Sequence, residues 1–300
     1  MRRIGVVGRC QSTVIGDAMR HMIEDCEVFT FAIQDVHIAR MQSYAEKVLP
    51  HCEIVFSHIL AEDHGYFSTR NLLAECRRIV PIPPIVFSGF HPDCVDLIVD
   101  GTGHPSPLGG YHSAIVAAAY SLDMPAERVE TLFNRLVYKR LGYFDEFGKA
   151  RTHLHNSMRD AGLDIAREWP DWVKSGTFMH TYNHPRSRVL ASLAKLLAVK
   201  AGLASTDIAV PDIGFDFLSI YPVWPVYPEL AEALGVAGSY IFKKNGTPEI
   251  ITGRNNLLSL REMIRESYDL YAEIPARVFG HPIIAKTRAA LSALLFEKGW

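Results

Sequence analysis

The sequence lacks a strong net charge and a long uninterrupted hydrophobic segment. Its formal net charge is -2 over 300 residues, so there is no reason to expect non-specific binding to nucleic acid or to an anionic membrane. Charged residues interrupt the two most apolar stretches: residues 189–204 contain Lys195 and Lys200, and residues 208–226 contain two aspartates. We therefore expect no integral membrane segment and no nucleic-acid partner, and a small molecule fits best.

Cysteine is scarce and is confined to the first third of the chain. The five cysteines are Cys10, Cys26, Cys52, Cys76 and Cys94. Their odd number and irregular spacing match neither a disulfide framework nor a zinc motif, and His180 and His184 lack the glutamate of the helical zinc pattern. The apolar stretch at the N-terminus ends at Val7, too short for the core of a signal peptide. We therefore predict no bound metal and a cytoplasmic location.

The first ninety residues do contain a regular alternation of apolar strand-like runs with helical ones. Strands are expected at residues 4–7, 26–31, 53–57 and 85–87, and helices at residues 13–23, 38–48 and 68–76. Such alternation is typical of a parallel sheet with crossover helices. The predicted fold class is α/β, with a Rossmann-like parallel sheet in the N-terminal half.

The middle and C-terminal parts of the chain are predicted to be mainly helical. Helices are expected at residues 111–120, 125–141, 186–201, 229–234 and 260–271, with a polar helical stretch that reaches Trp169. Ser259 and Glu262 have the spacing of a capping box before the last of these helices. We divide the chain into an α/β domain at residues 1–204 and a mainly helical region at residues 205–300 packed on it, as one composite domain.

A thiol lies at the first strand-to-helix turn of the expected sheet. The first strand runs into Gly8-Arg9-Cys10-Gln11-Ser12, where the positive end of the next helix favours thiolate over thiol. Ligands of open α/β sheets bind beyond this edge, so Cys10 is a candidate nucleophile, although a small packing residue is the competing interpretation. Ser12 is a rival nucleophile. Gln11 and the amides after Gly8 form a candidate oxyanion hole, but Gln11 can equally cap its own helix.

A second turn with unusual chemistry precedes the helix expected at residues 186–201. Pro185 suits a first helical position and biases His184 toward extended backbone, with Asn183 beside the imidazole. One hypothesis is a Cys10/His184 pair in which the imidazole takes the thiol proton. Structural hydrogen bonding is the competing interpretation for an isolated histidine.

These segments, in this order and spacing, resemble the WcbI-type polysaccharide-biosynthesis acetyltransferases of bacterial capsule clusters. The resemblance covers roughly residues 3–200, and residues 224–235 look like that family's Pro-x-Tyr-Pro stretch. The matching segments are Gly8 to Gln11, Tyr111-His112-Ser113 and Phe178 to Pro185. The resemblance implies a cradle-shaped α/β protein that binds coenzyme A and transfers acetyl to the hydroxyl of a capsular sugar.

The resemblance also assigns roles to residues. It implies a catalytic group of Cys10, Gln11, Asn183 and His184, and a coenzyme A site that includes Gly8, Arg9, Ser12 and His112. Arg9 stands where the family usually has asparagine, a departure that suits a contact to phosphate better than an oxyanion hole. Because coenzyme A carries phosphates, Arg186 and the amide of Gly110 are added as candidate contacts. His184 is the expected base, toward either the sugar hydroxyl or Cys10.

Two other functions fit the same residues. The arrangement distantly resembles SGNH-type hydrolases, with Cys10 or Ser12 for the serine, which implies removal of acyl groups from glycans. Thr181 stands where such enzymes have an aspartate three residues before the histidine, so the triad is incomplete. The third possibility is a non-catalytic protein that binds a nucleotide or a sugar.

Overall fold

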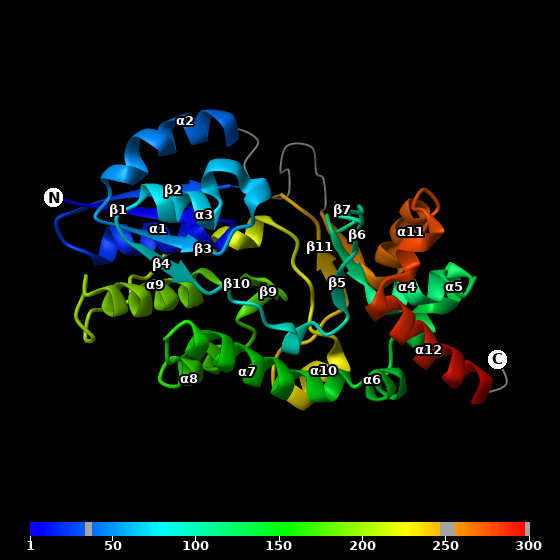
Figure 1. Ribbon diagram of the computed structural model, residues 1–300. Coiled ribbons are helices and arrows are strands. Elements are labelled where there is room, and N and C mark those ends of the chain that lie inside the picture. The colour runs from blue at the N-terminus through cyan, green and yellow to red at the C-terminus, as the bar shows by residue number, and fades with distance from the viewer. Residues whose placement is uncertain (34–37, 247–255, 298–300) are drawn as a thin grey trace, which may run out of the picture. The chain divides into compact units, whose positions relative to one another are not determined.

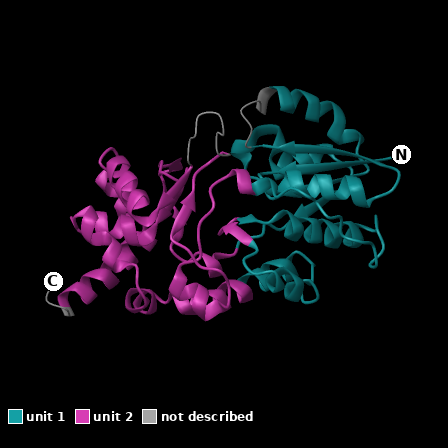
Figure 2. Ribbon diagram, turned by 180° about the vertical axis from the view of Figure 1, so that it is seen from behind, with its two compact units in different colours: residues 1–86, 153–178, 184–218 teal, residues 87–152, 179–183, 219–300 magenta. Residues whose placement is uncertain are grey.

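The chain forms two compact units, each built from segments that are distant in the sequence (Figure 2). The computed structural model describes residues 1–33, 38–246 and 256–297. Unit 1 consists of residues 1–86, 153–178 and 184–218, and unit 2 of residues 87–152, 179–183 and 219–300. The boundary expected at residue 204 therefore falls inside unit 1.

Unit 1 contains a four-stranded parallel sheet, which confirms the predicted α/β class. The strands are β1 (Arg2–Gly8), β2 (Cys26–Ala32), β3 (Ile54–His58) and β4 (Ile79–Ile82). Their order is β2-β1-β3-β4, and Ile4 of β1 lies between Val28 of β2 and Ile54 of β3. β3 is buried along its whole length, as expected for a parallel strand covered on both faces. The first three strands lie where the sequence predicts them.

The strand predicted at residues 85–87 is wrong, because the fourth strand lies at residues 79–82. β4 is at the edge of the sheet, where Pro81 is tolerated since an edge strand uses only one row of its backbone groups. Pro83 and Pro84 have no N–H to donate and end the strand. Ile85 instead exchanges two hydrogen bonds with a side chain, as described below.

Helices cover both faces of the sheet in unit 1 (Figure 1). α2 (Ile38–Val48) lies on one face, and α1 (Gln11–Met22) lies with α9 (Ser187–Ala201) on the other, where the two pack together. Two further helices are α3 (Thr69–Glu75) and α8 (Trp169–Lys174), while α7 (Tyr143–Asp160) continues from the segment of unit 2 into that of unit 1. The helices predicted at residues 13–23, 38–48, 68–76 and 186–201 are confirmed within two residues at each start.

Unit 2 combines helices with three antiparallel pairs of short strands. The helices are α4 (Ala114–Tyr120), α5 (Ala126–Val129), α6 (Arg135–Leu141), α10 (Pro228–Leu234), α11 (Leu260–Tyr271) and α12 (Pro282–Glu297). The pairs are β5 (Cys94–Asp96) with β8 (Tyr111–Ser113), β6 (Ile98–Val99) with β7 (Thr102–Gly103), and β11 (Ile241–Lys243) with β12 (Leu257–Ser259).

Short elements join these parts of the chain. β9 (Met179–Thr181) belongs to unit 2 and β10 (His184–Pro185) to unit 1. The 3-10 turns are η1 (Leu49–His51), η2 (Glu62–Phe67), η3 (Ser88–Phe90), η4 (Glu130–Leu132), η5 (Phe217–Ile220) and η6 (Ala276–Gly280). Of the helices in the described ranges, none combines the length and the apolar character needed to cross a bilayer.

Two helix predictions in unit 2 need correction. The helix predicted at residues 125–141 is interrupted, because Asn134 adopts an extended conformation and its side chain accepts the first N–H groups of α6. The helix predicted at residues 111–120 begins only at Ala114, since its first three residues form β8. The capping box of Ser259 and Glu262 is confirmed at α11.

A buried carboxylate lies in the core of unit 2. Asp93 is 0% exposed, and its two oxygens accept hydrogen bonds from the hydroxyls of Ser113, Tyr143 and Tyr227 and from the N–H of Ile115. Burial raises the pKa of Asp93 to about 6, while its hydrogen bonds act in the opposite direction. This one side chain therefore joins β8, α4, α7 and the segment before α10.

Candidate active site

The carboxyl edge of the sheet in unit 1 contains a topological switch point. In the order β2-β1-β3-β4, the chain winds to opposite sides of β1, so the switch falls between β1 and β3. Open α/β sheets bind their ligands at such a point, beyond the carboxyl ends of the strands. β1 ends at Gly8 and β3 ends at His58, and the turn that carries the thiol follows β1 directly.

Cys10 lies at the N-terminus of α1 and is partly buried. Its backbone is already helical, with φ -43° and ψ -36°. Burial raises the pKa of the Cys10 thiol, and the amide of Gln11 and the charge of Arg9 lower it by less. The expectation of an easily ionised thiol is therefore wrong, because the cost of burial exceeds the lowering by the Gln11 amide and the Arg9 charge.

The residues on either side of the thiol hold the turn in place. The N–H and the hydroxyl of Ser12 both donate to the carbonyl of Arg9, at 2.8 and 2.7 Å. The side-chain amide of Gln11 donates to the carbonyl of Ile85 at 2.9 Å, and its oxygen accepts from the N–H of Ile85 at 3.0 Å. Gln11 thus ties α1 to the loop after β4 rather than capping its own helix, and the hydroxyl of Ser12 is held by the fold.

Arg9 extends an exposed guanidinium at this edge. One of its N–H groups donates to Nε2 of His64 at 3.3 Å, and Nδ1 of His64 lies 2.7 Å from a carboxylate oxygen of Asp63. The geometry fits a neutral His64 that donates from Nδ1 to Asp63 and accepts at Nε2 from Arg9. This chain of contacts orients a positive charge beside the thiol turn.

Sequence reasoning missed His58, which ends β3 at the switch point. The ring lies so close to β1 that a Cβ atom on Gly8 would be 1.9 Å from its Nδ1, so glycine is required there. His58 is 7% exposed, and neither ring nitrogen has a hydrogen-bond partner among the described residues. Burial lowers the pKa of His58 to about 4, with a smaller contribution from Arg9. The polar pair Ser57-His58 after three apolar residues of the strand was the available signal.

Replacing His58 with leucine is expected to raise the free energy of unfolding by about 1–3 kcal/mol, because an apolar side chain of similar size removes two unpaired buried nitrogens. Urea unfolding at pH 7 measures the change. His51→Leu, at an exposed position of the same unit, is the matched control and should change the value little. A loss of stability in His58→Leu would contradict this account.

The second predicted turn leads into α9. His184 is buried in β10, and Figure 1 shows α9 running from β10 toward the side on which the N-terminus lies. α1 runs in that direction too, because it returns the chain from β1 to the parallel β2. Both helices therefore begin on the carboxyl side of the sheet, after the turns with Cys10 and His184.

Arg186 is engaged by its own unit. Its Nε donates to the carbonyl of Thr177 at 2.8 Å, and its guanidinium pairs with Asp216 at 3.4 Å. Asp216 also accepts from the N–H of Ser187 at 2.9 Å, so it satisfies the first turn of α9. Arg186 and Asp216 thus secure the start of this helix.

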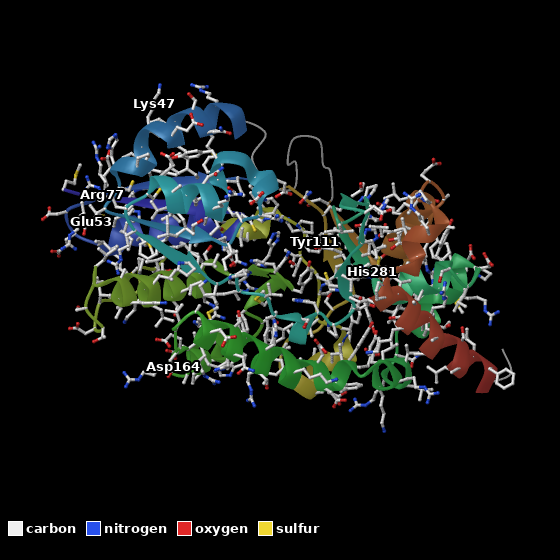
Figure 3. The ribbon with its side chains drawn as sticks, viewed as in Figure 1. Lys47, Glu53, Arg77, Tyr111, Asp164 and His281 are labelled. Carbon is white, nitrogen blue, oxygen red and sulfur yellow. The ribbon has the colours of Figure 1, made fainter. Side chains whose placement is uncertain are left out.

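Three predicted site residues belong to unit 2. The hydroxyl of Tyr111 donates to Oδ1 of Asn183 at 2.6 Å (Tyr111 is labelled in Figure 3). His112 is buried between the hydroxyl of Tyr271 and the carbonyl of His104, and burial lowers its pKa to about 4. An uncharged, enclosed imidazole is a poor partner for phosphate. Gly110 is exposed.

The structure thus gathers Gly8, Arg9, Cys10, Gln11 and Ser12 in one turn of unit 1. Within the described ranges, no group of three or more histidine, cysteine, aspartate or glutamate side chains could hold a metal ion. Fold and site together define an α/β protein with a candidate ligand site at the switch point of a parallel sheet, beside a partly buried thiol.

The chain belongs to the WcbI family, described as polysaccharide biosynthesis enzymes, whose profile matches residues 3–206. The match contains both the turn of Cys10 and the Asn183-His184-Pro185 turn. The protein is accordingly a member of an enzyme family.

A solved structure shares the fold. It is described as the native form of WcbI, a novel polysaccharide biosynthesis enzyme, without a disulfide bond between coenzyme A and a cysteine of that protein. It superposes with a TM-score of 0.68 over 96% of this chain and 98% of that chain, at 13% sequence identity. No curated protein matches the chain.

Proposed function

We propose that this protein is a coenzyme A-dependent acetyltransferase that O-acetylates a sugar in the synthesis of capsular or other polysaccharide. The observation that carries the proposal is the thiol of Cys10 at the switch point between β1 and β3. The description of the solved WcbI structure names coenzyme A together with a cysteine, which supports a thiol beside the donor. All five cysteines are unpaired, which supports a cytoplasmic location.

The turn after β1 has the donors that coenzyme A requires. The exposed guanidinium of Arg9, oriented through His64, suits a phosphate. The N-terminus of the twelve-residue α1 adds backbone amides and the positive end of its dipole. Acetyl-coenzyme A would supply the acetyl group as a thioester.

His184 is the proposed base for the sugar hydroxyl. As it takes the proton, the hydroxyl oxygen forms a bond to the acetyl carbon, the carbon–sulfur bond breaks, and the departing sulfur takes up a proton. The raised pKa of Cys10 favours a thiol that contacts the donor over a thiolate that becomes acetylated. Direct transfer in a ternary complex follows from this assignment.

The donor site can be tested with coenzyme A disulfide, a reagent that does not require the acceptor to be known. Attack by Cys10 on one sulfur breaks the disulfide, releases one coenzyme A thiol and leaves a mixed disulfide that peptide mass spectrometry locates. We expect labelling of Cys10 to be competed by acetyl-coenzyme A. Labelling should disappear in Cys10→Ser and persist in Cys26→Ser, another partly buried thiol of unit 1. Preferential labelling elsewhere would refute this donor site.

The role of His184 as the base is tested by measuring the release of coenzyme A thiol from acetyl-coenzyme A in the presence of sugar acceptors. His184→Ala should lower the transfer rate by about 10²-fold or more, while His51→Ala leaves it unchanged. Acetylated Cys10 in the intact protein mixed with acetyl-coenzyme A alone would contradict direct transfer.

A further inference from the structure

A cavity of about 580 Å³ lies entirely within unit 2. Its walls come mainly from residues 88–98, from the end of α6 and the start of α7, from Tyr182, and from residues 281–290, of which His281 is labelled in Figure 3. Ligand pockets for small molecules have volumes of roughly 300–1,000 Å³. A monosaccharide with a charged substituent fits this volume.

Two carboxylates in the wall are suited to sugar hydroxyls. The hydroxyl of Tyr182 donates to Asp96, and the hydroxyl of Ser88 donates to Glu146 at 2.6 Å. A carboxylate accepts up to about four hydrogen bonds, so each of these can accept more than the one hydroxyl described. The hydroxyl donors also fix the orientation of both carboxylates. Acceptors held in this way, beside the rings of Tyr143 and Tyr182, match a ligand rich in hydroxyl groups.

Cationic side chains line the same cavity. Arg140 at the end of α6 and Lys286 on α12 are both exposed, so they bring positive charge where the cavity opens. His281 adds an imidazole whose Nδ1 is buried and has no hydrogen-bond partner among the described residues. A buried nitrogen without a partner is costly, and a ligand atom would satisfy it. Two cations and an imidazole nitrogen without a partner among the described residues match an anionic group such as phosphate.

We propose that this cavity binds a phosphorylated monosaccharide, with the phosphate near Arg140 and Lys286 and the hydroxyls near Asp96 and Glu146. This sugar-phosphate site goes beyond the proposed acetyltransferase function, because the cavity belongs to unit 2 and the turn of Cys10 belongs to unit 1. The anionic group of the ligand is expected beside the two cations rather than beside Asp96 and Glu146, because these carboxylates would repel it.

Binding of α-hexose 1-phosphates to the full chain tests the proposal. Calorimetry and saturation-transfer NMR should detect the glucose, galactose or mannose 1-phosphate, with the parent hexose at least tenfold weaker. Arg140→Met and Lys286→Met should each weaken phosphate-sugar binding by about tenfold or more, the loss expected for one charge-assisted hydrogen bond. Lys139→Met is the matched control, since Lys139 is exposed beside Arg140 and does not line the cavity.

Coenzyme A is the second probe, because it also carries phosphates. Its affinity should be unchanged in Arg140→Met and Lys286→Met. If these variants lose coenzyme A binding equally, the cavity belongs to the donor and the proposal is wrong. It is also wrong if the hexose phosphates bind no better than the hexoses. Labelling of Cys10 by coenzyme A disulfide is independent of these outcomes, so failure here is distinguishable from failure of the acetyltransferase assignment.

Discussion

Replacing Asp93 with alanine is expected to lower the free energy of unfolding by about 3–5 kcal/mol. The change leaves the hydroxyls of Ser113, Tyr143 and Tyr227 and the N–H of Ile115 without their acceptor in a fully buried place. Each unsatisfied buried donor costs about 1–3 kcal/mol. The loss is reduced because the variant no longer buries a charge, and the expected total allows for this.

Urea unfolding followed by circular dichroism measures the effect, with hydrogen exchange of peptides from unit 2 to locate it. Asp93→Asn keeps one acceptor oxygen and should lose less than Asp93→Ala. Asp269→Ala, at an exposed position on α11 of the same unit, is the matched control and should change stability by about 0.5 kcal/mol or less. An equally small loss in Asp93→Ala would show that the carboxylate does not hold this core together.

The protein is expected to lose about 5 kcal/mol of stability between pH 7 and pH 5. Burial lowers the pKa of His58 and of His112 to about 4 and that of His91 to about 3, against an ordinary 6.5. Below pH 6.5 the unfolded chain binds protons that these folded imidazoles do not. Each of these three histidines therefore lowers the free energy of unfolding by about 2 kcal/mol at pH 5. Asp93 acts in the opposite direction. Burial raises its pKa to about 6, so the folded protein takes up this proton more readily than the unfolded chain, and the free energy of unfolding rises by about 1 kcal/mol as the pH falls through 6.

Urea midpoints at pH 7, 6 and 5 check this expectation. His58→Leu and His112→Gln should each flatten the profile by about 2 kcal/mol, because each removes one imidazole that must remain neutral. The exposed His51 provides the control, and His51→Gln should keep the steep profile. Stability that rises toward pH 5 in the unmodified protein would mean that these rings are protonated in the folded state.

The sequence predicts the local elements of this protein well where one physical signal dominates. Apolar runs separated by helical patterns locate β1, β2 and β3, and the capping box locates the start of α11. α12 was not predicted, because its apolar residues are spread around the helix and give no one-sided pattern.

The same reasoning fails where two neighbouring segments are equally apolar and only one of them can pair with the sheet. Residues 85–87 are as apolar as β4, but β3 pairs with residues 79–82, and the backbone of Ile85 is paired by Gln11 instead. The interruption of the helix at Asn134 has a different cause, because an extended residue with a capping side chain begins a new helix.

The sequence by itself determined the α/β class, the strand-to-helix turn that carries Cys10 and the membership of a family suggested by the order of its motifs. Those properties depend on neighbouring residues and on spacing along the chain. Only the tertiary structure decided that burial raises the pKa of Cys10, that Gln11 holds Ile85, that His58 lies against Gly8, and that Asp93 joins four segments of unit 2. Solvation and hydrogen bonding at these positions depend on residues far away in the sequence, which come together only when the chain folds.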